Sequence, residues 1–437
     1  MNNSRRLFCK NSLTMAAGAG IVSMIPSQLS CSNPNETIVI GAIGVRNMGF
    51  ADLRSFLRQK NVKCKAICDI DKDVLNKVSV QVEKTTGTKP DVYTDFRKLL
   101  EDKDIDAVVI GTPDHWHCLM SIYAMQAGKH VYVEKPMANT IAEAIIMEKA
   151  VERYQKVLSV GQWQRSGPHW QDAVDYIREG KLGKISRVKA WAYTRKHTLP
   201  VKPDGPVPEG VDYDMWLGPA PKRPFNPNRF HYNFRYFWEY AGGLMADWGV
   251  HMLDYALYGM NVHAPSRIMA MGGSLSHPDD ARQTPDTLNV LYDFKDFVVE
   301  WEHSIVLGME KFGNRCGIAY EGNNGTLIAN RGGWQVIGEK DNKGKPLGED
   351  VPFIKGQGDL DKHVDNFLTC IRNDKLETKC SVKDGKEVAI LTHMGNIAYR
   401  TGEILQWDDQ NNKFIGSEKA NALIKPDYRS PWKFPEI

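Results

Sequence analysis

Residues 37–49 read TIVIGAIGVRNMG, and this stretch decides the fold. A run of β-branched residues leads into Gly44, and Gly49 follows shortly after. In a dinucleotide-binding turn the first glycine bends the chain, a middle glycine lets the backbone approach the pyrophosphate, and the last lets the helix pack on the strand. Arg46 occupies the middle position, where its guanidinium can pair with phosphate. The stretch therefore predicts a strand, a phosphate-binding turn and a helix.

An acidic residue follows at the spacing that a dinucleotide site requires. Asp69 ends a second strand-like run, residues 62–69, and comes 20 residues after Gly49. A carboxylate there accepts hydrogen bonds from the adenosine ribose and repels a 2′-phosphate. The sequence therefore favours NAD, and Arg46 keeps NADP open as the alternative. The competing interpretation of Asp69 is a loop aspartate that caps the next helix.

Strand-like and helix-like segments alternate through the first third of the chain. We expect strands at 37–41, 62–69, 107–111, 130–134 and 157–160, and helices at 50–57, 73–83, 115–127 and 140–154. Repeated strand, helix, strand units imply a parallel sheet covered on both faces. We therefore predict an α/β fold, with a doubly wound Rossmann domain over residues 34–160 and a second domain over residues 161–437.

The second half of the chain has a different pattern. Strand-like runs separated by turns occupy residues 267–272, 288–294, 297–303, 316–321, 325–329 and 333–337, and helical periodicity occupies 362–372 and 383–402. These runs predict an open, mainly antiparallel sheet on which the two helices pack. Prolines and aromatic residues crowd residues 191–240, which we expect to form an ordered loop without regular structure.

Composition excludes several classes of protein. The 437 residues are 42% hydrophobic and 25% charged, which excludes a disordered, collagen-like or coiled-coil chain. Three of the 56 basic residues lie in the first 31 positions, so the remainder balances 53 basic against 53 acidic residues. This neutrality argues against a nucleic-acid partner. The cysteine spacings fit neither a metal knuckle nor a disulfide framework, and we expect no metal.

Residues 1–31 resemble an export signal. Arg5 and Arg6 precede a short apolar stretch, residues 13–25, and then Pro26, in the order typical of a twin-arginine signal. We therefore expect export to the periplasm or cell envelope of a bacterium, with Cys31 as a candidate lipid anchor. The alternative is a basic tail before a buried helix. Beyond this segment no apolar run reaches the roughly 18 residues of a membrane-spanning helix.

Two further motifs end predicted strands. GTPDHWH occupies residues 111–117, and Glu134, Lys135 and Pro136 follow the next strand. Ligands bind at the carboxyl ends of parallel strands, so both motifs should line one cleft. For Lys135 the alternative is a solvated surface side chain. The residues that we expect to bind the cofactor are Gly44, Arg46, Asn47, Met48, Gly49, Asp69, Thr112, Pro113, His117 and Glu134.

Together with Gly242, Gly243 and the stretch DWGVHMLD at residues 247–254, these motifs resemble those of the glucose-fructose oxidoreductase, inositol dehydrogenase and rhizopine catabolism family, Gfo/Idh/MocA. The resemblance runs from about residue 37 to the C-terminus. It implies an N-terminal Rossmann domain and a C-terminal α/β domain that is often used in oligomer contacts, so we expect a homodimer or homotetramer. It also implies that Lys135, Asp247 and His251 are the catalytic residues.

The chemistry of these three residues agrees with that assignment. On a helix Asp247 and His251 share one face. Oxidation of a secondary alcohol needs a base for the hydroxyl proton, which suits histidine, and Asp247 would orient it or accept a substrate hydroxyl. Lys135 would stabilise the alkoxide-like transition state. The alternatives are a structural histidine at position 251 and a metal held by Asp247, His251 and Asp254.

Aromatic side chains near the predicted cleft suit a sugar. Flat apolar rings pack on the C–H faces of a pyranose, and an arginine can donate to its oxygens. The residues that we expect to bind substrate are Trp163, Arg165, Tyr193, His231 and Tyr236.

An exported nicotinamide enzyme meets no free pool of cofactor, so it has to hold the dinucleotide tightly. We therefore predict an exported NAD(P)-dependent dehydrogenase that oxidises a secondary hydroxyl of a sugar or glycoside, with C3 as the expected carbon. One alternative is a redox-neutral glycosidase, in which transient C3 oxidation permits elimination and Lys135, His251 or Tyr193 removes the C2 proton. The other alternative is a non-catalytic sugar-binding protein.

Overall fold

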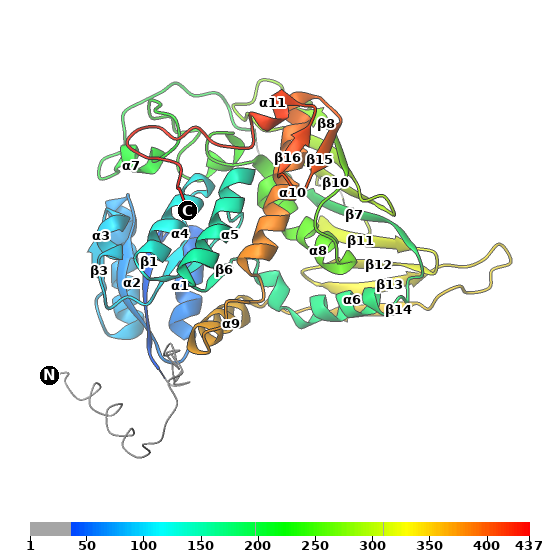
Figure 1. Cartoon of the computed structure of the whole chain (residues 1–437), viewed down its shortest axis with the longest axis horizontal. Coiled ribbons are helices and arrows are strands. Elements are labelled where there is room, and N and C mark those ends of the chain that lie inside the picture. Colours follow the sequence, from blue (N-terminus) through cyan, green and yellow to red (C-terminus); the bar gives the residue numbers. More distant parts are fainter. Residues whose placement is uncertain (1–35, 197, 309) are drawn as a thin grey trace, which may run out of the picture. The chain divides into compact units, whose positions relative to one another are not determined.

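A computed structural model describes residues 36–196, 198–308 and 310–437 (Figure 1). The predictions made for the export signal, including Arg5, Arg6 and the candidate anchor Cys31, lie outside the described residues. In the part of the chain that is described, no helix combines the length and apolar character needed to cross a membrane.

Residues 38–160 form the predicted Rossmann unit. Its elements are β1 (Ile38–Ile43), α1 (Asn47–Arg58), β2 (Val62–Cys68), α2 (Lys72–Thr86), β3 (Asp91–Tyr93), α3 (Phe96–Leu100), β4 (Ala107–Ile110), α4 (Asp114–Gln126), β5 (His130–Val133), α5 (Ile141–Tyr154) and β6 (Leu158–Val160). The strand order is β3-β2-β1-β4-β5-β6, and every pair is parallel. The doubly wound sheet is confirmed.

Alternate residues of the central strands β1, β2, β4 and β5 enter two different cores, which is why these strands are largely apolar on both faces. On β4, Val108 and Ile110 pack with α3, α4 and α5, whereas Ala107 and Val109 pack with α1 and α2. The second core also contains α9 (Leu360–Arg372), which contacts α1. The prediction that residues 362–372 pack on the second sheet is therefore wrong, since Val364, Phe367 and Leu368 cover the Rossmann sheet.

The second sheet is mainly antiparallel, as predicted. It contains β7 (Ile185–Tyr193), β8 (Arg267–Gly273), β9 (Thr287–Asp293), β10 (Val298–Ser304), β11 (Cys316–Gly322), β12 (Gly325–Asn330), β13 (Gly333–Gly338), β14 (Val351–Lys355), β15 (Leu405–Asp408) and β16 (Lys413–Ile415). Their order is β14-β13-β12-β11-β7-β10-β9-β8-β15-β16, and among the described strands of this second sheet only β7 and β10 pair in parallel. The helices α6 (Pro168–Arg178), α8 (Val250–Met260) and α10 (Val382–Thr401) contact this sheet (Figure 1).

Residues 191–240 depart from the prediction of a loop without regular structure. They contain the end of β7, the short helix α7 (Tyr213–Leu217) and the 3₁₀ turn η3 (Asn233–Tyr236). Strand β7 escaped prediction because Arg187 and Lys189 interrupt its apolar run. Both side chains pair with Glu321 of β11 on one face of the sheet, while Val188 and Ala190 are buried on the other.

Candidate active site

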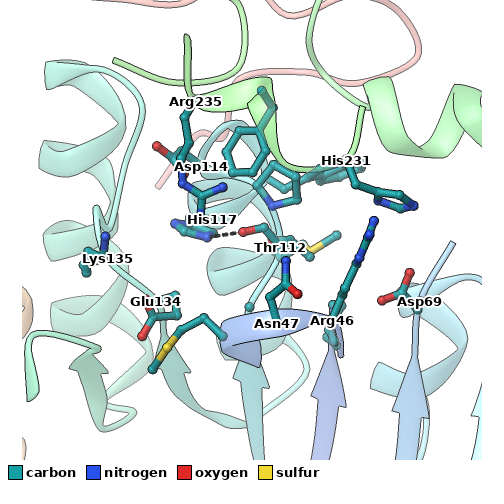
Figure 2. A pocket seen from close by; sticks show the side chains of 18 of the residues that line it. Arg46, Asn47, Asp69, Thr112, Asp114, His117, Glu134, Lys135, His231 and Arg235 are labelled. Atoms are coloured by element: carbon teal, nitrogen blue, oxygen red, sulfur yellow. Dashed lines mark hydrogen bonds between the residues drawn. The ribbon is translucent and has the colours of Figure 1, made fainter. Parts of the chain in front are cut away.

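A cleft with a volume of about 520 Å³ lies at the carboxyl ends of β1, β2, β4 and β5 (Figure 2). Parallel sheets bind ligands at this edge. Residues from four later segments complete its walls: Trp163, residues 215–251 in part, Arg331 and Leu360. Both predicted strand-end motifs, represented by Thr112 and Lys135, line it as expected.

The turn after β1 leaves room for a diphosphate because three glycines pack together. Gly44 has a φ of 75°, in the left-handed region. A Cβ on Gly49 would lie 1.9 Å from the Gly44 carbonyl oxygen, and one on Gly111 would lie 2.4 Å from the Gly49 Cα. Helix α1 begins at Asn47, with no acidic residue in its first turn and no side-chain cap. Its first amides therefore fit an anionic group such as a pyrophosphate.

Arg46 and Met48 line the cleft beside this turn. The Arg46 side chain is exposed, and in Figure 2 it extends past Asp69 toward His231. Gly49 does not line the cleft, because it serves the contact between α1 and β4.

Asp69 faces the cleft from the end of β2. Its carboxylate accepts hydrogen bonds from the backbone N–H of Val45 at 2.9 Å and of Asp71 at 3.2 Å, and burial raises the pKa of Asp69 to about 6. Helix α2 is capped by Asp71, whose carboxylate accepts from the amides of Asp73 and Val74. The alternative of Asp69 as the helix cap is therefore wrong, and Asp69 remains suited to a ribose.

His117 ties the two strand-end motifs together. Its Nε2 lies 2.7 Å from the Thr112 carbonyl oxygen (Figure 2), and its Nδ1 lies 2.7 Å from the Pro136 carbonyl oxygen. Since both ring nitrogens already contact backbone, His117 fixes the loops that carry Thr112 and Lys135. His117 was predicted to bind the cofactor. We assign it instead the role of positioning the two loops, since neither ring nitrogen is left for a hydrogen bond to the cofactor. Pro113 is the N-cap residue of α4 and lines the cleft.

Lys135 and Asp247 form the centre of the site. The Lys135 Nζ donates to Asp247 Oδ1 at 2.7 Å and to the Asp247 carbonyl oxygen at 2.9 Å. Arg235 Nε lies 3.6 Å from the same carboxylate oxygen. Burial alone would raise the pKa of Asp247, but Lys135 and Arg235 outweigh it and hold that pKa well below its usual range. The carboxylate therefore stays ionised and fixes both cations.

His251 lines the same cleft one helical turn later. Asp247 belongs to the π-helical segment η4 (Met245–Gly249), and His251 lies in the first turn of α8. Burial, with the charges of Lys135 and Arg331, lowers the pKa of His251 well below its ordinary value of 6.5. Its Nδ1 has no hydrogen-bond partner among the described residues. A neutral imidazole next to a fixed lysine can accept a proton at neutral pH.

Two other acidic groups surround this centre. Burial raises the pKa of Glu134 to about 7. It also raises to about 7 the pKa of Asp114, a residue for which the sequence predicted no role. Both line the cleft. Each can therefore change its protonation near neutral pH.

The predicted substrate-binding residues divide into two groups. Trp163 lines the cleft, and so does His231, but His231 Nε2 lies 3.0 Å from Asp71 Oδ2 beside Arg46, away from Lys135 (Figure 2). Tyr193 and Tyr236 are buried and do not line the cleft. These three assignments are therefore corrected: His231 belongs to the end of the cleft that carries Asp69, and the two tyrosines belong to the core.

Arg165 is also corrected. Its guanidinium is buried and pairs with Asp254 at 2.7 Å and with Asp384 at 2.7 Å, outside the cleft lining. This pairing occupies Asp254 as well, which removes it from the alternative metal set. The spacing of Arg165 after β6 suggested a ligand, but sequence could not reveal its carboxylate partner 89 positions later.

Several cleft residues were missed. Arg235 and Phe234 lie in a segment expected to be irregular, and Arg331 lies in a turn without a motif. A charged residue embedded in the aromatic run at 230–240 was the one available signal for Arg235. No such signal marks Arg331.

This fold and this cleft define an NAD-binding oxidoreductase built from a Rossmann domain and a second α/β domain. The chain belongs to the Gfo/Idh/MocA family. A model described as the oxidoreductase family NAD-binding Rossmann fold matches residues 38–162, and one described as the oxidoreductase family C-terminal alpha/beta domain matches residues 184–434.

Known proteins similar to the chain include a curated relative and solved structures. A glycosyl hydrolase family 109 protein from Shewanella baltica is 33% identical over 173 residues, which are 39% of this chain and 36% of that relative. The match thus spans little more than a third of that relative's length. Aldose-aldose oxidoreductase from Caulobacter crescentus, complexed with glycerol, has a TM-score of 0.65 at 19% identity, over 85% of this chain and 100% of that chain. Levoglucosan dehydrogenase in complex with NADH has a TM-score of 0.64 at 20% identity, over 85% of this chain and 99% of that chain. These two similarities establish a common fold.

Proposed function

We propose that the protein oxidises a secondary hydroxyl of a sugar or glycoside, using NAD that it holds tightly. The observation that carries this proposal is the convergence of Lys135, Asp247 and His251 in the same cleft as the glycine turn and Asp69. C3 is the carbon that we expect to react.

The three side chains divide the work on the hydroxyl group. His251, neutral because its pKa is lowered, accepts the hydroxyl proton. Lys135, held by Asp247, donates a hydrogen bond to the oxygen and stabilises the negative charge that develops there. Bound NAD supplies the acceptor for the two electrons that leave the carbon.

The cofactor preference follows from the charges around the ribose site. The Asp69 carboxylate accepts hydroxyl donors and disfavours a 2′-phosphate, which supports NAD. Arg46, close beside it, is the group that would compensate a phosphate, so NADP is the alternative (Figure 2). Its replacement by glutamine should leave NAD binding within about threefold and lower any NADP binding by about tenfold or more, as measured by calorimetry.

A redox-neutral glycosidase is the second candidate, and the name of the Shewanella baltica relative favours it. In this reaction the C3 ketone acidifies C2–H, a base removes that proton, the leaving group departs, water adds, and the electrons return to C3. Tyr193 no longer qualifies as the base, because it is buried outside the cleft. Lys135, His251 and the cleft-lining Tyr232 are the groups available for this step.

One experiment separates the candidates. The purified protein is first extracted to identify any bound dinucleotide, and is then incubated with aryl glycosides without added cofactor. A ketosugar that accumulates only with an added carbonyl acceptor supports the dehydrogenase. Steady release of the phenol without a ketosugar supports the glycosidase. Absence of bound nucleotide, with no binding of added NAD, supports a sugar-binding protein and contradicts both enzymes.

We also propose that the protein is exported by the twin-arginine route, on the pattern of residues 4–26 alone. The variant with Arg5→Lys and Arg6→Lys should remain in the cytoplasm of the host cell. Cell fractionation measures this, and unchanged export of the variant would contradict the proposal.

A further inference from the structure

The part of the cleft that contains Lys135, Asp247 and His251 also contains Arg331, a cation to which the proposed reaction gives no role. Arg331 follows β12 and lines the cleft together with Lys135, Asp247 and His251. In the described part of the chain its guanidinium forms one hydrogen bond, from Nε to Gln164 Oε1 at 2.8 Å, and no ion pair. Lys135 and Arg235 differ in this respect, because both share the Asp247 carboxylate.

The Arg331 guanidinium lies over two indole rings. Its Cζ lies 4.8 Å from the ring centroid of Trp163 and 4.7 Å from that of Trp248. Trp163 belongs to η2 (Trp163–Ser166) and Trp248 to η4, so three separate elements meet at this side chain. Stacking of this kind orders an arginine before any ligand arrives. Since Nε is engaged by Gln164, the two terminal nitrogens remain for a ligand.

A half-buried charge without a partner is costly, and the nearest negative groups do not supply one. Burial lowers the pKa of Arg331, and Cys316, Asp247 and Glu134 only partly offset this effect. Asp247 already serves Lys135 and Arg235, and burial raises the pKa of Glu134 to about 7. The missing negative charge therefore has to come with the ligand.

We propose that the sugar carries a carboxylate, as a uronic acid or its glycoside does, and that the terminal nitrogens of Arg331 bind it. The proposal rests on the function proposed above. A planar guanidinium matches a planar carboxylate through two parallel hydrogen bonds, which a neutral hydroxymethyl group cannot form. Arg331 is close enough to His251 for its charge to lower the pKa of that residue. One sugar can therefore bind Arg331 through its carboxylate and present a hydroxyl to His251.

The test compares aryl hexuronides with the corresponding aryl hexosides, which differ only at C6, on the full protein with its bound dinucleotide. We expect kcat/KM to favour the uronide by about 100-fold. The Arg331→Met variant should lose that preference mainly through a higher KM, and Arg331→Lys should restore only part of it. Calorimetric binding of the same two sugars gives a second readout that does not depend on turnover. Arg187→Met is the matched control, since Arg187 is exposed on β7 outside the cleft.

The outcomes separate the two proposals. An unchanged uronide to hexoside ratio in Arg331→Met, with normal oxidation of either sugar, overturns the carboxylate site and leaves the oxidoreductase standing. Arg331-dependent binding of the uronide without turnover supports the carboxylate site and contradicts the proposed reaction. A stronger preference for an aryl hexoside 6-sulfate than for the uronide overturns the assignment to a carboxylate. Failure of every sugar to bind overturns the carboxylate site.

Discussion

The protonation state of His251 decides over which pH range the proposed reaction runs. Burial and two nearby cations lower its pKa well below 6.5, so the imidazole stays neutral and able to accept a proton as pH falls through that value. Activity should be lost only when pH falls through the lowered pKa. The acidic limb of the kcat/KM profile, measured with a neutral glycoside, should therefore lie below pH 6.5.

Arg331 allows a test of why the pKa of His251 is low, because the positive charge of Arg331 contributes to lowering that pKa. Removing that charge in Arg331→Met should raise the pKa of His251 and move the acidic limb toward higher pH. Arg187→Met should leave the limb in place. An acidic limb that stays fixed in Arg331→Met would contradict the assignment of that limb to His251.

Removal of Lys135 or of His251 should lower turnover without affecting the bound dinucleotide. Lys135→Met deletes the donor that we expect at the reacting oxygen, and turnover should fall by about 100-fold or more. Turnover of the His251→Ala variant should fall by a similar factor. Both variants should retain bound dinucleotide, since neither substitution touches the glycine turn. Steady-state rates and nucleotide extraction measure these two effects, and near-normal rates in both variants would remove the site assignment.

At the scale of elements, the packing of α1 against Gly44, after β1, and Gly111, after β4, is a tightly constrained feature of the nucleotide site. Gly49→Ala would bring a Cβ within 1.9 Å of a backbone oxygen, which no side-chain motion can relieve. We expect a loss of at least about 2 kcal/mol in the free energy of unfolding, together with loss of bound dinucleotide. Denaturant titration and nucleotide extraction measure the two changes.

Gly205→Ala is the control for this variant, because nothing lies within 4 Å of the added Cβ. It should change the unfolding midpoint little. Bound dinucleotide retained at its normal level in Gly49→Ala would show that the site tolerates displacement of α1 from the turn that contains Gly44.

The elements also show how far a sequence can predict this fold. Central strands of the Rossmann sheet such as β4, with its AVVI run, were predictable because they are buried on both faces and therefore uniformly apolar. The edge strand β3 was not predicted, because its three residues are largely exposed and include Asp91. Strand β7 was not, since its charged residues pair across strands that are distant in sequence. Helix α9 was predicted as a helix, but its amphipathic pattern does not say which sheet it covers.

The same limit applies to the candidate site. Lys135, Asp247 and His251 were predictable from motifs and from helical spacing, and all three line one cleft. Arg165 was predicted to bind substrate and does not line the cleft, whereas Arg331, for which the sequence predicted nothing, does. A buried partner neutralises Arg165, whereas Arg331 lacks one in the described chain, and this difference depends on contacts that only the folded molecule reveals.

At the scale of the whole molecule, the open face of the second sheet bears on the predicted homo-oligomer. Met269 and Met271 on β8, Leu291 on β9 and Ile337 on β13 are exposed apolar side chains on strands of this sheet. If this face joins two copies, the Met271→Lys and Leu291→Lys double variant should shift the mass measured by light scattering to that of one chain. An unchanged mass would contradict use of this face.

The C-terminal segment returns to the Rossmann unit after α11 (Glu418–Asn421) (Figure 1). Tyr428 Oη donates to the buried Glu143 carboxylate at 2.5 Å, and burial raises the pKa of Glu143 to about 7. Trp432 packs edge-on against Trp116, with ring centroids 4.9 Å apart, and Trp116 lines the cleft. The last residues of the chain therefore support the wall of the nucleotide site.

Trp432→Ala should lower the free energy of unfolding by about 3 kcal/mol, because it removes a buried indole and leaves a cavity beside α4. The dinucleotide should also bind more weakly, since Trp116 loses its packing partner. Denaturant titration and calorimetry with NAD measure the two effects, and Trp432→Phe should recover most of both. A normal unfolding midpoint in Trp432→Ala would show that this segment does not brace the cleft. Lower stability with unchanged NAD affinity would show that Trp432 contributes to the stability of the core but not to cofactor binding.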